Sequence, residues 1–185
     1  TALLLLESGK DLNGEVTVPT DLTQEFKDIQ NANGTTMGLR IGETVRRIDL
    51  LNALLITSAN DAASVIASDV ADGSLPNFVA MMNARAKDIG CTNTVFVDAC
   101  GLDEGNLTTA RDMYLILRYA MSFDLLKEVV KTPLYNMGLS PRYMDGSYNI
   151  RTTDMMIASS FGGDYYRSYA QGGKTGSLGE WQNFA

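Results

Sequence analysis

The feature that most constrains the fold is a pair of apolar segments in the middle of the chain, separated by five residues. Residues 50–56 are apolar on both faces, which is typical of a helix buried on all sides. A second apolar helix is predicted over residues 62–70. The residues between them are Thr57, Ser58, Ala59, Asn60 and Asp61.

This polar interruption between two buried helices needs a physical reason. For Asp61, capping of the second helix is a sufficient explanation, because a carboxylate accepts hydrogen bonds from the first amides of a helix. For Ser58 and Asn60, a cavity-facing role competes with capping. A hydroxyl and an amide two positions apart can point into the same space.

Capping residues and apolar periodicity predict the other helices. Residues 1–9 resemble the later part of a buried helix, and Thr44 is expected to cap the helix that enters the central segment. Pro76 opens a helix that Gly90 closes. Thr108 or Thr109 is expected to cap a helix over residues 110–121, and a short helix follows over residues 125–130.

Strands are predicted mainly towards the end of the chain. Residues 135–137 and 148–150 are candidate strands around an Asp145-Gly146 turn. Residues 94–97 alternate as a short strand, and residues 11–42 are expected to form small strands and loops. The sequence shows neither repeats nor a linker, so a single domain is expected.

Composition excludes several classes of function. The chain has 185 residues with a net charge of −7, and its lysines and arginines are scattered, which argues against a nucleic-acid-binding surface. It contains no histidine, which excludes hydrolases with an imidazole base and most catalytic zinc sites. Any catalytic base must be a lysine or a carboxylate. Cys91 and Cys100 are too few for a structural zinc site; a disulfide and two free thiols both remain open.

The glycine-rich stretch over residues 171–181 carries the most distinctive chemistry. Glycines flank Lys174-Thr175, so another backbone can approach this pair closely, as when a strand edge receives a peptide. A lysine ammonium beside a threonine hydroxyl is suited to hold a carboxylate. A basic residue in a glycine-rich hairpin is the simpler alternative. A phosphate-binding loop is excluded, because that motif needs a glycine where Ser168 stands.

Two separated motifs resemble signatures of the penicillin-interacting serine enzymes. Ser58-Ala59-Asn60 resembles the S-x-N element and Lys174-Thr175-Gly176 the K-T-G element. Residues 54–63, 82–90, 101–102 and 108–113 also resemble one family of these enzymes. That family is the low-molecular-mass D-alanyl-D-alanine carboxypeptidases, which are penicillin-binding proteins. Residues 1–7 resemble the segment that directly follows the S-x-x-K motif in that family.

The chain departs from the family pattern at the nucleophile. No serine in the sequence has a lysine three positions later, so the S-x-x-K motif is absent. On the family pattern, that motif would lie just upstream of Thr1. The last residues, 184–185, would lie inside a continuing sheet. We therefore expect residues 1–185 to be one DD-peptidase domain, incomplete at both ends.

The resemblance implies an α/β fold of the α+β type, in which an antiparallel sheet is flanked by helices beside a mainly helical lobe. It implies a serine-type enzyme that removes the terminal D-alanine of peptidoglycan pentapeptide through an acyl-enzyme and is inhibited by β-lactams. It implies catalytic roles for Ser58 and Lys174. It implies substrate-binding roles for Asn60, Thr175, Gly176 and Ser177.

Each implied role has a physical basis. Ser58 would relay a proton to the leaving amine, and Asn60 would bind a substrate amide. Lys174 and Thr175 would hold the terminal carboxylate. The backbone N–H of Ser177 would donate to the oxyanion, with Gly176 allowing the close approach.

The resemblance implies no metal and no organic cofactor. The implied partners are the peptidoglycan stem peptide and β-lactam antibiotics, without nucleic acid. The implied location is the bacterial cell envelope, outside the cytoplasmic membrane, with any membrane anchor lying outside this chain. Exposed sheet edges would favour self-association.

Two rival functions remain open. A β-lactamase of the same fold needs a carboxylate placed to speed deacylation. Glu104 precedes Asn106-Leu107 without the spacing of a Glu-x-x-Leu-Asn element. A non-catalytic module that binds peptidoglycan peptides or β-lactams fits the absence of the nucleophile.

Overall fold

In the computed structural model, the two apolar segments form the centre of the molecule, as the sequence predicts. The first comprises helix α3 (Arg47–Asn52) and a π-helical turn, η2 (Ala53–Thr57), and the second is helix α4 (Asn60–Val70). Leu50, Leu51, Val65 and Ile66 are fully buried. The structure describes residues 1–138, 148–178 and 181–184.

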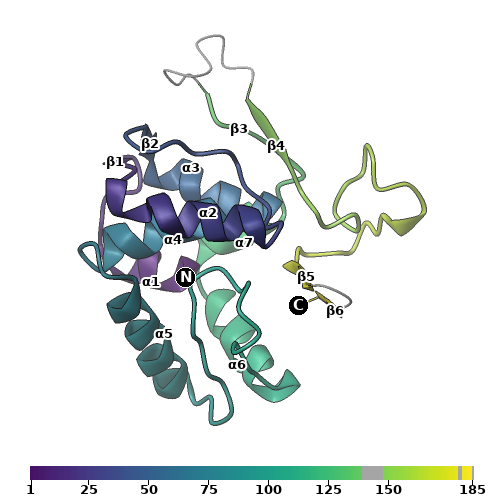
Figure 1. The fold of residues 1–185 in the computed structure, drawn as a ribbon. Helices are drawn as coiled ribbons and strands as arrows, with labels where there is room; N and C mark the ends of the chain where they lie inside the picture. Colours follow the sequence, from purple (N-terminus) through teal and green to yellow (C-terminus); the bar gives the residue numbers. More distant parts are fainter. Residues whose placement is uncertain (139–147, 179–180, 185) are drawn as a thin grey trace.

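Other helices surround this centre (Figure 1). They are α1 (Ala2–Glu7), the 3-10 turn η1 (Thr20–Leu22), α2 (Thr23–Asn31), α5 (Leu75–Ile89), α6 (Ala110–Ala120) and α7 (Asp124–Val130). The main core joins the central helices to Leu5, Leu22 and Leu126, and a smaller cluster is built around Phe78. Each of these buried side chains stabilises the fold by roughly 1.5–3 kcal/mol.

The caps of α5 and α6 confirm the helix boundaries predicted from sequence. The Ser74 hydroxyl accepts from the Asn77 amide at 3.3 Å at the start of α5, and Gly90 ends that helix with φ +99°. The Thr109 hydroxyl accepts from the Asp112 amide at 3.2 Å at the start of α6. Of the two threonines considered, Thr109 is therefore the cap.

The described strands form three two-stranded antiparallel ladders. The ladders pair β1 (Glu15–Thr17) with β2 (Thr44–Arg46), β3 (Leu134–Asn136) with β4 (Asn149–Arg151), and β5 (Thr175–Leu178) with β6 (Trp181–Phe184). The pairing of residues 135–136 with 149–150 confirms the strands predicted there. The Asp145-Gly146 turn lies outside the described residues. Helices packed with antiparallel strands confirm the α+β fold class.

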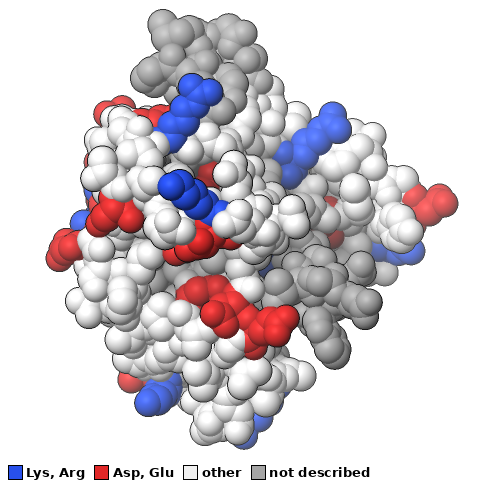
Figure 2. All heavy atoms as spheres, viewed as in Figure 1, with Lys and Arg blue, Asp and Glu red and all other residues white. Residues whose placement is uncertain are grey.

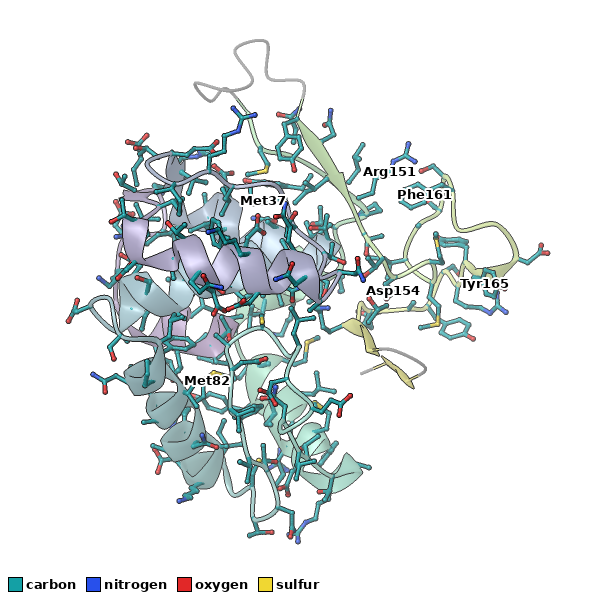
Figure 3. The ribbon with its side chains drawn as sticks, viewed as in Figure 1. Met37, Met82, Arg151, Asp154, Phe161 and Tyr165 are labelled. Atoms are coloured by element: carbon teal, nitrogen blue, oxygen red, sulfur yellow. The ribbon has the colours of Figure 1, made fainter. Side chains whose placement is uncertain are left out.

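A long connection leads from β4 to β5 and brings β5 back beside the helical body (Figure 1). It contains the 3-10 turn η3 (Gly163–Tyr165). The Arg151 guanidinium lies over the Phe161 ring at 5.1 Å, which fastens the connection to β4 (Figure 3). Gly162 is required here, since a Cβ would lie 2.2 Å from the Met155 carbonyl oxygen.

Two predictions about the first 46 residues were wrong. Thr44 does not cap a helix; it lies in β2, where its hydroxyl is 3.3 Å from that of Thr17, and the helix begins at Arg47. β-Branched Thr44 and Val45 suit a strand once β1 supplies a partner. Residues 11–42 contain the nine-residue helix α2 as well as a small strand, since α2 packs Ile29 into the core.

Two further predictions need correction. Residues 94–97 form no strand; a single antiparallel bridge joins Val95 to Leu107. Asp61 does not cap α4, whose N-cap is Ala59. Asp61 Oδ1 does accept from the Ala62 amide in the first turn of α4, at 2.9 Å. The carboxylate also accepts from the amides of residues 37–39, at 3.0, 2.9 and 2.9 Å, and so holds the loop before β2. Cys91 and Cys100, left open above, are both free thiols.

Lysines and arginines are scattered over the visible surface (Figure 2), as they are along the sequence. On the face that Figure 2 shows, lysine and arginine side chains stand apart from one another among neutral and acidic surface. No helix in the described part of the chain combines the length and the apolarity needed to cross a membrane.

Candidate active site

Ser58 lies at the break between η2 and α4, in an unusual backbone conformation. Its φ and ψ are 62° and 39°, in the left-handed region that a residue with a Cβ rarely adopts. The preceding π turn is closed on the Ala53 carbonyl, which accepts from the Thr57 hydroxyl at 3.0 Å and the Ala59 amide at 3.2 Å. Strained residues and π turns are both concentrated at functional sites.

Lys174 contacts Ser58 directly, although 116 positions separate them. Its Nζ donates to Ser58 Oγ at 2.8 Å and to the Thr175 carbonyl oxygen at 2.5 Å. Because an ammonium has three N–H donors, one more is available to a ligand beyond these two contacts within the described residues. Burial lowers the pKa of Lys174 to about 8.

The segment that carries Lys174 is positioned by its packing on α7. Gly172 has φ +114°, and a Cβ there would lie 2.5 Å from the Val130 carbonyl oxygen. Only glycine allows this approach. Gly172 therefore allows this segment to pack against the end of α7. The sequence alone did not predict this contact.

Thr175 adds a hydroxyl beside Lys174, and Thr153 contacts it. Thr153 Oγ1 and Thr175 Oγ1 are hydrogen-bonded, and either can donate. The Thr153 amide donates to the Ile56 carbonyl oxygen in η2 at 3.1 Å. Sequence reasoning missed Thr153, which belongs to no motif; its one signal was its position just after a predicted strand.

Asn60 is held by the loop that precedes β2. Its backbone amide and its Nδ2 both donate to the Thr35 carbonyl oxygen, at 2.8 and 3.1 Å, and its side chain is buried. Gly34 allows this approach, since a Cβ there would lie 2.8 Å from Asn60 Nδ2. Hydrogen bonds thus join Ser58, Lys174 and Thr175 into one group, whereas the N–H donors of Asn60 lead to Thr35. Its Oδ1 is the atom suited to accept from a ligand amide.

Gly176 and Ser177 continue β5 after Thr175. In the antiparallel register they lie opposite Asn183 and Gln182. The two predicted backbone positions therefore lie on the same strand as Thr175, one and two residues beyond it. The arrangement combines a cation, two hydroxyls and a strand, which can hold a peptide carboxylate and move a proton near it.

Comparison with known proteins identifies similar chains. The family described as D-alanyl-D-alanine carboxypeptidase matches residues 1–180. A D-alanyl-D-alanine endopeptidase of Pseudomonas aeruginosa is 29% identical over 157 residues, which cover 85% of this chain and 48% of that protein. The D-alanyl-D-alanine carboxypeptidase DacC of Escherichia coli is 43% identical over 83 residues, 44% of this chain and 20% of that protein.

Solved structures extend the similarity to the fold. The Streptomyces K15 DD-transpeptidase superposes with a TM-score of 0.81 at 28% identity, over 99% of this chain and 69% of that one. A D-alanyl-D-alanine carboxypeptidase of Mycobacterium tuberculosis gives a TM-score of 0.76 at 29% identity, over 95% of this chain and 60% of that one. The chain spans less than half the length of the two curated relatives described above.

Proposed function

Because the chain belongs to the D-alanyl-D-alanine carboxypeptidase family, we propose that its protein is a serine-type D-Ala-D-Ala carboxypeptidase. It removes the terminal D-alanine of peptidoglycan pentapeptide through an acyl-enzyme, and β-lactams inhibit it. The reaction takes place in the cell envelope, outside the cytoplasmic membrane. The observation that carries this proposal is the 2.8 Å hydrogen bond between Lys174 and Ser58, which joins the two motifs.

The proposed substrate is held by its terminal carboxylate. The remaining N–H of the Lys174 ammonium and the Thr175 hydroxyl donate to the two carboxylate oxygens, by charge and by a neutral hydrogen bond. Asn60 Oδ1 accepts from a substrate amide while Nδ2 keeps its bond to Thr35. The Ser177 amide and Gly176 form the side of the site that receives the developing oxyanion.

Ser58 serves as the proton relay in this proposal. The nucleophilic serine and its lysine partner belong to the S-x-x-K motif, which is not among these 185 residues. The serine oxygen attacks the penultimate D-alanine carbonyl carbon, and its proton passes to the neutral lysine of the same motif. As the peptide C–N bond breaks, Ser58 gives its own proton to the leaving amine and takes one back from that S-x-x-K lysine. Since Ser58 Oγ accepts from Lys174, the Ser58 proton is directed away from Lys174. Water then hydrolyses the acyl-enzyme.

Replacing Ser58 by alanine is expected to slow acylation by β-lactams more than it weakens their initial binding. In the full-length protein, the rate of β-lactam acylation should fall at least tenfold more than the affinity of the initial complex, because proton transfer contributes mainly in the transition state. Stopped-flow acylation at several penicillin concentrations gives both quantities. Ser160→Ala, at an exposed serine, is the matched control. An equal loss in both quantities would argue against the relay.

Ligand binding is also expected to weaken above about pH 8. Lys174 is protonated below its pKa of about 8 and neutral above it. A penicillin carboxylate stays ionised throughout this range, so the alkaline loss reports on the lysine. The second-order acylation rate constant should decline through this pH, and Lys174→Arg should move the decline beyond pH 10. A wild-type profile that is flat from pH 7 to pH 10 would contradict the assignment.

The rival candidate is a module that binds peptidoglycan peptides or β-lactams without catalysis. Intact-mass spectrometry after incubation with penicillin separates the two. A covalent adduct on the full-length protein, and none on residues 1–185 alone, supports the carboxypeptidase. A folded full-length protein without an adduct supports the binding module. Slow release of the adduct distinguishes a carboxypeptidase from a β-lactamase of the same fold.

A further inference from the structure

Thr153 connects the two motifs by a second route besides the Lys174–Ser58 bond. On one side its amide donates to the carbonyl oxygen of Ile56, two residues before Ser58. On the other side its hydroxyl is hydrogen-bonded to that of Thr175. We propose that Thr153 is a positioning residue that directs the single hydroxyl proton of Thr175 towards the substrate carboxylate. This proposal rests on the proposed function.

The backbone around Thr153 is fixed on both sides. The amide of Thr152 donates to the Pro133 carbonyl oxygen at 3.0 Å, and the amide of Asp154 donates to the Thr152 hydroxyl at 3.0 Å. Thr152 and Asp154 are both buried, and Asp154 lies where the connection leaves β4 (Figure 3). Since both neighbours are anchored, the backbone at Thr153 has little freedom, and its exposed side chain is held by the hydrogen bond to Thr175.

The direction of the hydroxyl pair follows from hydrogen-bond counting. Each hydroxyl has one proton and two lone pairs, so only one of the two threonines donates within the pair. A carboxylate is an acceptor only. When it binds Thr175, the Thr175 proton must point to it, and Thr153 must then be the donor within the pair. The resulting chain runs from Thr153 to Thr175 to the carboxylate, and each bond polarises the next.

The test replaces the Thr153 hydroxyl by a methyl group, which keeps the shape of the side chain. In the full-length protein, wild type should prefer an N-acyl-D-alanyl-D-alanine peptide with a free C-terminal carboxylate over the same peptide with a C-terminal amide. Thr153→Val should reduce this preference. The expected loss in the ratio of kcat/KM values is roughly three- to tenfold, the size of one neutral hydrogen bond. It should appear in KM, with kcat nearly unchanged. Thr153→Ser should restore the preference.

A double-mutant comparison separates positioning from a merely structural effect. Thr175→Val should lower the same preference, and Thr153→Val combined with it should lower it no further, because both act through one proton. Additive losses would overturn the proposal, as would a Thr153→Val protein that keeps the full preference. A wild-type protein that does not distinguish the two peptides would overturn the carboxylate anchor itself, and this result is recognisable before any variant is made.

Discussion

Replacement of Lys174 by alanine is expected to slow β-lactam acylation of the full-length protein by about a hundred- to a thousandfold. The change removes a charge-assisted hydrogen bond to the ligand carboxylate and the donor that orients Ser58. Lys174 is partly buried, and burial lowers its pKa, so its removal relieves a desolvation cost. The thermal midpoint should therefore stay close to that of the wild-type protein.

Second-order acylation rate constants, measured by stopped-flow or by the growth of the adduct mass, check this result. Lys131→Ala, at an exposed lysine, is the matched control and should leave the rate unchanged. Lys174→Arg keeps the charge and should retain part of the rate. A Lys174→Ala protein that acylates at the wild-type rate would eliminate the carboxylate anchor.

Replacement of Asp61 by alanine is expected to lower the free energy of unfolding by about 3–5 kcal/mol. The buried carboxylate accepts from the three backbone amides of residues 37–39, and alanine would remove this shared acceptor. The same loop continues back to Thr35, whose carbonyl holds Asn60. Loss of Asp61 should therefore disturb the site as well as the core.

Urea unfolding of the purified protein, followed by circular dichroism, measures the change. Asp61→Asn should cost less than alanine, because the amide oxygen still accepts from one or two of the amides. Asp164→Ala, at an exposed aspartate, should change the free energy by less than about 0.5 kcal/mol. If Asp61→Ala also falls within that range, the carboxylate does not hold this loop.

The sequence predicted the centre of the fold because apolar periodicity and caps act locally. The buried pair α3 and α4, and helix α5 with its end at Gly90, follow from neighbouring residues alone; α5 begins at Leu75, one residue before the predicted Pro76. Helix α2 was missed because only Phe26 and Ile29 are apolar among its nine residues, and its stability comes from packing on α4. The loop-holding role of Asp61 was missed because the amides of residues 37–39 lie more than twenty positions earlier in the chain.

The same distinction applies to the candidate site. Ser58 and Lys174 were predicted because two short motifs carry them, and the structure brings the two side chains into contact. The contact between Thr153 and Thr175 depends on how the long connection folds back from β4, and no local pattern encodes it. The strained backbone of Ser58 likewise follows from the π turn before it, which propensities do not reveal.

The π turn of residues 53–57 also has a consequence for insertions and deletions in this chain. A π turn holds one residue more than the α-helical turn it replaces. Deleting a single residue from it would leave both central helices apolar. It would, however, rotate the residues that follow by about 100° about the helix axis. Ser58 would then point away from Lys174. The number of residues in this turn, more than the identity of its apolar residues, therefore decides whether Ser58 and Lys174 come into contact.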